Sequence, residues 1–172
     1  MPIGKERFTA DDAEQLFCQV HNIDDAAEAA KIFIERTSPP NLEGEAFFNM
    51  TERTLLQSLI EYQRLYGRQS KMIVWSIYGL LLESRLNDPD FPGTTAGASA
   101  PMSKLDKRFL EVKQTNEDSA AAASYFKFKA ASVIIEGPVL ISLMMRFQYL
   151  LTETTDAKNC TRTIKGTVPA LC

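Results

Sequence analysis

Apolar residues recur every three to four positions along most of the chain, which is the spacing of one face of an α-helix. No stretch alternates apolar and polar residues over the length of a β-strand. The pattern therefore predicts an all-α fold, a single compact bundle of about six or seven helices. The segments with this spacing are residues 10–20, 24–37, 45–66, 70–86, 104–113, 115–131 and 139–153.

Four of the expected helices begin at residues that are typical N-caps. A side-chain oxygen at such a position accepts a hydrogen bond from a backbone N–H of the first turn. Segments 9–12 and 103–106 each place an aspartate three residues after a hydroxyl residue, as in a capping box. Asn22 or Asp24 opens the second helix, and the segment 115–118 opens the sixth.

The densest apolar run lies at residues 133–151. A helix that is apolar over most of its circumference has to be surrounded by others, so we expect residues 139–153 at the centre of the bundle. Gly137-Pro138 either kinks the chain before this helix or separates it from the preceding one. Residues 70–86 are apolar almost all round and predict a second buried helix. The polar residues of 139–153 share one narrow stripe of a helical wheel, made of Ser142, Arg146, Tyr149 and Glu153.

The length of the chain fits one helical domain, which we place at residues 1–155. Residues 156–172 are a polar tail without helical spacing, expected to be loosely ordered or a linker. A long flexible loop is expected at residues 87–102, which hold three prolines and two glycines. Such a loop is either a recognition element or an insertion that the fold tolerates, and the insertion is the commoner case.

Charge and hydropathy argue against two classes of protein. A net charge of −3 at pH 7 excludes a globally basic nucleic-acid binder. Residues 133–151 include Glu136, Gly137-Pro138 and Arg146, so we expect a bundle core there rather than a membrane span. The first residues of the chain turn acidic where a signal peptide would turn apolar. We expect a cytoplasmic location without direct membrane insertion.

Residue types that carry catalysis or bind metals are sparse. Three cysteines lie far apart and His21 is the only histidine, so no metal site or disulfide framework is expected. His21 lies between two helices, where a solvated or capping histidine is typical, and Cys18 is expected as a small core side chain. The nucleotide-binding glycine motifs and the His-Glu-x-x-His zinc motif are missing. We predict no catalytic residue, no metal and no cofactor in this segment.

Glu136 and Arg146 are the charges most out of place, since both lie within apolar sequence. An isolated charge inside a protein is costly, so we expect each to form an ion pair, with the other or with a different helix. The acidic pairs elsewhere, such as Asp11-Asp12 and Asp24-Asp25, stand at expected helix starts. Capping and the helix dipole account for them without a catalytic role.

Basic residues cluster between positions 104 and 129 among aromatic side chains. Such a mixture can bind nucleic acid, because bases stack on aromatic rings and phosphates pair with cations. Solvated helix charges above buried aromatics explain it more often, and Lys127 and Lys129 point about 160° apart on a helix. The candidate residues for binding a substrate or nucleic acid are Lys104, Lys107, Arg108, Lys113 and Lys127.

Two blocks of the sequence resemble a known family. The first is residues 45–62, EAFFNMTERTLLQSLIEY. The second is residues 105–146, where the order is Leu105-Asp106, Phe109, the Asn116–Asp118 turn, Tyr125-x-x-Phe128-Lys129-x-Ala131, Leu140-Ile141-Ser142 and Arg146. Together they resemble the all-alpha domain of the type IV coupling proteins, the TraG-like ATPases of conjugation systems, particularly those of Gram-positive bacteria. The resemblance covers roughly residues 24–155.

The resemblance implies a function for this segment. In that family the helical domain is inserted into a RecA-like motor domain that is anchored in the membrane. It faces the cytoplasm and receives a relaxase–DNA complex or a secreted protein before translocation. The expected function is therefore a substrate receptor in conjugative DNA transfer. The expected partners are relaxase or relaxosome proteins, or other secreted substrate proteins, and the parent ATPase motor domain, with DNA contact secondary.

The sequence departs from the family at two points. Ser132-Val-Ile134 stands where the family often has a Gly-Lys-Thr-like run, and neither Walker motif is present. ATP hydrolysis is therefore not expected of this segment and would belong to flanking parts of a parent protein. Two other interpretations stay open. One is a DNA-binding helical module that uses residues 104–129 and the loop 87–102, and the other is a structural bundle that mediates self-association.

Overall fold

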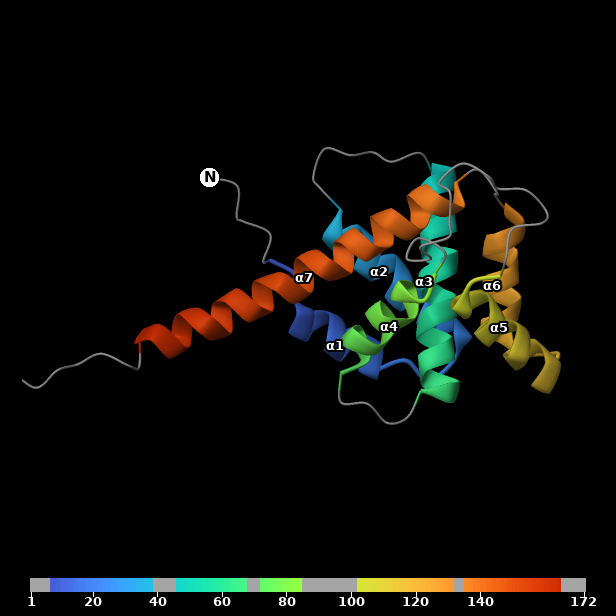
Figure 1. The fold of residues 1–172 in the computed structure, drawn as a ribbon, viewed down its shortest axis with the longest axis horizontal. Helices are drawn as coiled ribbons and strands as arrows, with labels where there is room; N and C mark the ends of the chain where they lie inside the picture. The colour runs from blue at the N-terminus through green and yellow to red at the C-terminus, as the bar shows by residue number, and fades with distance from the viewer. Residues whose placement is uncertain (1–6, 39–45, 68–71, 85–101, 132–134, 165–172) are drawn as a thin grey trace, which may run out of the picture.

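The computed structural model describes residues 7–38, 46–67, 72–84, 102–131 and 135–164, and the regular elements in these ranges are all α-helices. Within this part of the chain there is no strand, so the predicted all-α bundle is confirmed. No helix in it is long and apolar enough to cross a membrane. The helices are α1 (Ala10–Cys18), α2 (Ile23–Thr37), α3 (Ala46–Tyr66), α4 (Ile73–Leu82), α5 (Lys104–Thr115), α6 (Ala120–Ala131) and α7 (Glu136–Ile164) (Figure 1).

Local capping chemistry sets the start of several helices. A capping box opens α1 at Thr9 and another opens α5 at Ser103, both as predicted. Asn22 caps α2 by accepting hydrogen bonds from two backbone amides of the first turn. The prediction for α6 was wrong in detail. This helix begins after Ser119, whose hydroxyl accepts from a first-turn amide, and not within the segment 115–118.

The centre of the bundle is α3. It contacts α2, α4, α6 and α7, and it stands between the α5–α6 pair and the remaining helices (Figure 1). The sequence pattern had placed residues 139–153 at the centre, and that prediction was wrong. The fully buried apolar side chains of α3 are Leu55, Leu56, Leu59 and Ile60.

Two groups of stacked aromatic rings lie in the core. Phe33 of α2 stacks on Phe147 of α7 with 4.7 Å between ring centroids, and Phe17 of α1 lies 5.5 Å from Phe33. In the other group, Phe109 of α5 stacks on Tyr125 of α6 with centroids 4.0 Å apart. All five rings are buried. Contacts between the rings therefore stabilise the core in addition to the burial of their apolar area.

One face of α7 is covered by the bundle and the opposite face is open to solvent, although apolar side chains stand on both. Val139, Leu143 and Phe147 are fully buried, whereas Ile141 and Met145 are 48% and 64% exposed. A helix that is apolar over most of its circumference can be packed on several sides. Its sequence does not show which of those sides other helices cover. This is why the prediction of a fully enclosed helix failed.

α4 shows the same arrangement on a smaller scale. It is shorter than the predicted segment 70–86, and only one of its faces is buried, through Val74, Ile77 and Leu81. On its outer face Trp75 is 47% exposed, and Leu82 is exposed as well. The predicted buried helix is therefore a surface helix with an apolar outer face.

α7 extends through residues 156–164, which the sequence pattern assigned to a loosely ordered tail. The sequence holds no proline or glycine between Pro138 and Gly166, and adding residues to an existing helix costs far less than starting one. This end of α7 projects beyond the other helices in Figure 1. Residues 165–172 lie outside the described residues, as does the predicted loop 87–102 except for its last residue.

Gly137-Pro138 separates α6 from α7 rather than kinking one continuous helix. α6 ends at Ala131 and α7 begins at Glu136, so the pair stands in the first turn of α7. Proline is tolerated there because the N–H that it lacks has no partner within the helix.

Candidate functional site

A buried ion pair between α3 and α7 is the centre of an extended polar network. Glu52 of α3 is fully buried, and Nε and Nη2 of Arg146 donate to its two carboxylate oxygens at 2.8 and 3.1 Å. Ser142, one turn before Arg146 on α7, donates its hydroxyl to the same carboxylate at 2.8 Å. Two parallel N–H donors facing two oxygens form the strong bidentate geometry of arginine and carboxylate.

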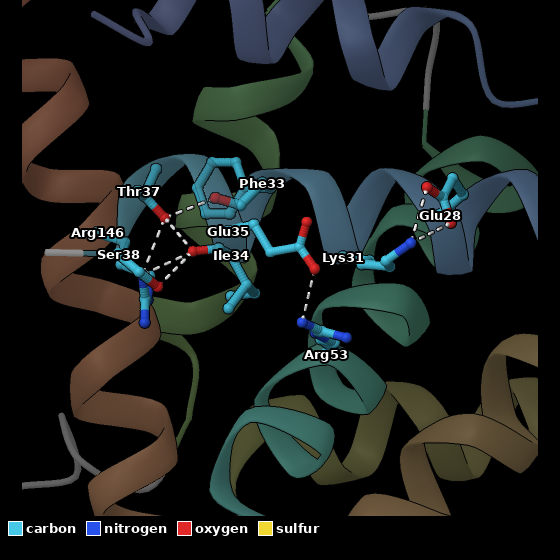
Figure 2. A network of polar contacts seen from close by, with 9 residues as sticks. All are labelled: Glu28, Lys31, Phe33, Ile34, Glu35, Thr37, Ser38, Arg53 and Arg146. Carbon is cyan, nitrogen blue, oxygen red and sulfur yellow. Dashed lines mark hydrogen bonds and ion pairs between the residues drawn. The ribbon is translucent and has the colours of Figure 1, made fainter. Parts of the chain in front are cut away.

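The remaining guanidinium nitrogen of Arg146, Nη1, binds the C-terminal end of α2. It donates to the carbonyl of Ile34 at 3.2 Å and to the hydroxyls of Thr37 at 3.0 Å and Ser38 at 3.1 Å (Figure 2). A helix C-terminus carries free carbonyl groups and partial negative charge, which favours a cation. Arg146 therefore joins α2, α3 and α7.

Each nitrogen of the Arg146 guanidinium donates within the protein, so this network holds α2, α3 and α7 together. The expected ion pair to another helix is confirmed for Arg146, but the sequence analysis did not identify Glu52 as its partner. A signal was present. Glu52 precedes Leu55 and Leu56 by three and four residues, which places its carboxylate on the buried stripe of α3.

A second buried cluster surrounds Asp106 in the first turn of α5. One carboxylate oxygen accepts hydrogen bonds from the backbone N–H and hydroxyl of Ser103, at 2.9 and 2.8 Å. The other accepts from the hydroxyl of Tyr125 at 2.8 Å and lies 3.2 Å from Nζ of Lys129. Burial opposes ionisation of Asp106, but the Lys129 ammonium and the hydrogen bonds from Ser103 and Tyr125 outweigh it. They hold the pKa of Asp106 below its usual value.

Lys129 connects this cluster to the start of α7. Its ammonium lies between Asp106 and Glu136, and it donates a hydrogen bond to the Glu136 carboxylate. The expected ion pair to another helix is therefore confirmed for Glu136 as well. The cluster joins α5, α6 and the first turn of α7, because one ammonium pairs with two carboxylates.

The N-terminus of α4 is capped by a side chain from a distant part of the sequence. Met72 stands at the N-cap position and makes no side-chain cap. The carboxylate of Glu14 on α1 accepts hydrogen bonds from the N–H groups of Ile73 at 2.5 Å and Val74 at 2.9 Å. A carboxylate at this end of a helix also offsets the positive end of the helix dipole.

We expect the substitution Glu14→Ala to lower the free energy of unfolding by about 1–2 kcal/mol, because it leaves two amides of α4 without an acceptor. Urea unfolding at pH 7 measures this change. The matched control is Gln15→Ala, a neighbouring exposed position on α1, which should change stability by less than about 0.5 kcal/mol. Equal effects of the two substitutions would contradict the capping role.

The five candidate binding residues differ in their surroundings. Arg108 donates to Glu83 with 2.7 Å between Nη2 and Oε1, and this hydrogen bond raises the pKa of Arg108. Lys113 lies over the ring of Phe126, with Nζ 5.1 Å from the ring centroid. The other three are exposed and make no ion pair within the described part of the chain, and they are Lys104 and Lys107 on α5 and Lys127 on α6.

The potential catalytic side chains lie at the surface. Cys18 is exposed, so its predicted core position was wrong, and partial desolvation and the neighbouring Glu14 raise the pKa of its thiol. His21 is exposed, in agreement with a solvated histidine, and its backbone N–H donates to Asp25. Within the described residues, no three histidine, cysteine, aspartate or glutamate side chains are grouped so that they could hold a metal ion.

The chain was compared with family models, curated proteins and solved structures, and nothing matches it in any of the three.

Proposed function

We propose that this chain is the substrate-docking domain of a conjugative coupling protein. It receives a relaxase, alone or with its DNA, or another secreted protein, and passes it to an ATPase motor that this segment does not contain. The proposal starts from the two sequence blocks 45–62 and 105–146, which resemble the helical domain of that family. It is a binding function, and it requires no catalytic residue in this chain.

The proposal rests on one observation: residues of the two sequence blocks contact one another between helices. Glu52, from the first block, binds Ser142 and Arg146, from the second. Within the second block, Asp106 accepts a hydrogen bond from Tyr125. The residues behind the resemblance are thus contacts between helices, so a shared pattern at these positions supports a shared helical arrangement. The outer helix faces are then available for docking, as a receptor domain requires.

A DNA-binding module is the second candidate, and a specific observation favours it. Lys104, Lys107 and Lys127 are exposed, and cations of this kind pair with phosphate. Against it, Glu111 is also exposed and lies one turn after Lys107, where it offsets the positive charge of α5. The net charge of −3 further favours a protein partner with basic surfaces over DNA.

A paired titration tests the proposal. Labelled single-stranded DNA, and separately the relaxase of the same conjugative element, are titrated with the protein at low and near-physiological salt. We expect the relaxase to bind with a dissociation constant of about 1–100 µM and the DNA not to bind at near-physiological salt.

The double variant Lys104→Glu Lys107→Glu and the control Lys31→Glu, an exposed lysine of α2, separate the two functions. The proposal fails if DNA binds alone and the double variant abolishes that binding while the control does not. It also fails if neither probe binds.

A further inference from the structure

Residues 7–9 stand directly before α1 and connect it to α7 at the surface of the bundle. Arg7 donates a hydrogen bond from Nη2 to the hydroxyl of Tyr149 on α7 at 2.6 Å, and its Cζ lies 5.6 Å from the centre of the same ring. Thr9 is the N-cap of α1, so the segment is fixed to α1 at one end and to α7 at the other. We call residues 7–9 the N-terminal strap.

Phe8, in the middle of the strap, packs against the aromatic group formed by α1, α2 and α7. Its ring meets the edge of Phe33 with 6.1 Å between centroids. Phe33 stacks in turn on Phe147 of α7. From the exposed side of α2, Cζ of Arg36 lies 5.7 Å from the centre of the Phe8 ring. The strap therefore covers the joint at which α2 packs on α7.

The contacts that hold the strap are exposed to water, whereas those beneath it are not. Arg7 and Arg36 are exposed, and Tyr149 is 55% exposed. Water competes for an exposed cation, so a cation–π contact at the surface is weaker than one in a desolvated site. Phe33 and Phe147 are fully buried. A region with few buried contacts opens at a lower free energy than the whole protein, and the strap is such a region.

The strap contacts α7 close to the point where this helix leaves the bundle. Leu150 and Leu151, directly after Tyr149, are the last buried side chains of α7 within the described residues, and the helix continues to Ile164. Its far end projects beyond the other helices (Figure 1). A helix end without tertiary contacts is only marginally stable in water. The contact at Tyr149 thus lies at the boundary between the docked part and the projecting part of α7.

We propose that the N-terminal strap is a latch that controls local undocking of α7. When Arg7 leaves Tyr149, residues 147–152 move away from α2 and expose the buried rings of the joint, while the rest of the bundle stays folded. Arg146 limits the movement, because its guanidinium is bound to the buried carboxylate of Glu52. α5 and α6 take no part, because α3 stands between them and the other helices (Figure 1). The latch requires no substrate, so its test is independent of the docking function.

Hydrogen exchange of the full chain at pH 7, followed by mass spectrometry, tests the latch. In the native protein we expect the backbone amides of residues 147–152 to exchange faster than those of residues 55–60 in α3. Arg7→Ala should speed exchange at residues 147–152 about tenfold and change it at residues 55–60 by less than about twofold, because it makes only the local opening easier. The matched control is Gln148→Ala, which removes an exposed side chain from the same turn of α7 and should change neither rate.

A double-variant comparison shows whether the contact itself is responsible. Tyr149→Ala removes the other half of the contact and should speed exchange at residues 147–152 by about the same factor as Arg7→Ala. The double variant Arg7→Ala Tyr149→Ala should then exchange no faster than either single variant. If the two factors multiply instead, the side chains act independently, and the proposal is overturned.

The exchange rates of α3 separate local from global opening. The proposal is overturned if Arg7→Ala leaves exchange at residues 147–152 unchanged, because the strap then does not hold α7. It is also overturned if the same variant speeds exchange equally at residues 55–60, because the protein then opens as a whole. Urea unfolding of each variant provides an independent measure of its global stability.

Discussion

Replacing Arg146 with methionine is expected to lower the free energy of unfolding by about 3–5 kcal/mol. The substitution keeps much of the side-chain volume but removes the cation from a fully buried carboxylate, that of Glu52. It also removes a donor from the C-terminal end of α2, at Ile34, Thr37 and Ser38. Urea unfolding at pH 7, followed by circular dichroism, measures the loss.

The double variant Glu52→Met Arg146→Met distinguishes the pair from simple loss of packing. With both charges replaced, no uncompensated charge remains in the core, and a hydrophobic pair of similar volume is often tolerated. We expect the double variant to be more stable than the sum of the single effects predicts, by at least about 2 kcal/mol. Additive losses would show that the two side chains act independently.

The control for this experiment is an exposed ion pair close by. Lys31 and Glu28 on α2 are one turn apart at the surface, with 3.3 Å between Nζ and Oε1 (Figure 2). Lys31→Ala should change stability by less than about 1 kcal/mol, because water screens exposed charges. If Lys31→Ala lowered the free energy of unfolding as much as Arg146→Met does, the stability would depend on surface charge in general and not on the buried network.

Replacing Asp106 with asparagine is expected to cost about 2–3 kcal/mol at pH 7. The amide cannot accept the backbone N–H of Ser103 on the side where its own NH₂ group lies, and it gives no charge to Lys129. The loss is smaller than for Arg146 because Lys129 keeps its second partner, Glu136.

The same variant predicts a pH dependence. The pKa of Asp106 is lower in the folded protein than the value of about 3.9 in an unfolded chain, so the ionised carboxylate stabilises the fold. This contribution is fully present above about pH 4 and is lost as the pH falls through the folded pKa. We therefore expect the difference in stability between the native protein and Asp106→Asn to shrink from pH 7 to pH 3.

Asp118→Asn serves as the control, because Asp118 is exposed in the turn between α5 and α6. Its effect on stability should be small at both pH values. Urea unfolding of the three proteins at pH 7 and pH 3 measures all of these differences. A gap between the native protein and Asp106→Asn that stays constant or widens at low pH would contradict the assignment.

Features set by neighbouring residues could be predicted from the sequence. Ser103 and Asp106 are three residues apart and form their capping box within one turn. The residue types and their spacing were therefore sufficient to predict this cap. The cap of α4 could not be found in this way. Its acceptor, Glu14, lies on another helix, and only the packing of α1 against α4 brings the two together.

In the candidate site too, contacts between residues far apart in the sequence could not be predicted. The polar stripe through Ser142 and Arg146 was visible, but its partner Glu52 is 94 residues before Arg146 in the chain. For the basic residues, the sequence did not distinguish Lys113, which covers an aromatic ring, from Lys104, which points to solvent. Residue type gives the possible partners of a charge, and tertiary contacts select among them.

The separation between Glu52 and Arg146 also matters while the protein is being made. At about 5–20 residues per second, a ribosome adds Arg146 about 5–20 s after Glu52. Until then the carboxylate has no guanidinium to bind and has to stay hydrated, because burying it alone is too costly. The interior between α2 and α3 therefore cannot close fully while α1 to α6 are being synthesised. Docking of α7 is the step that completes this core, so the nascent chain stays partly open until α7 has been made.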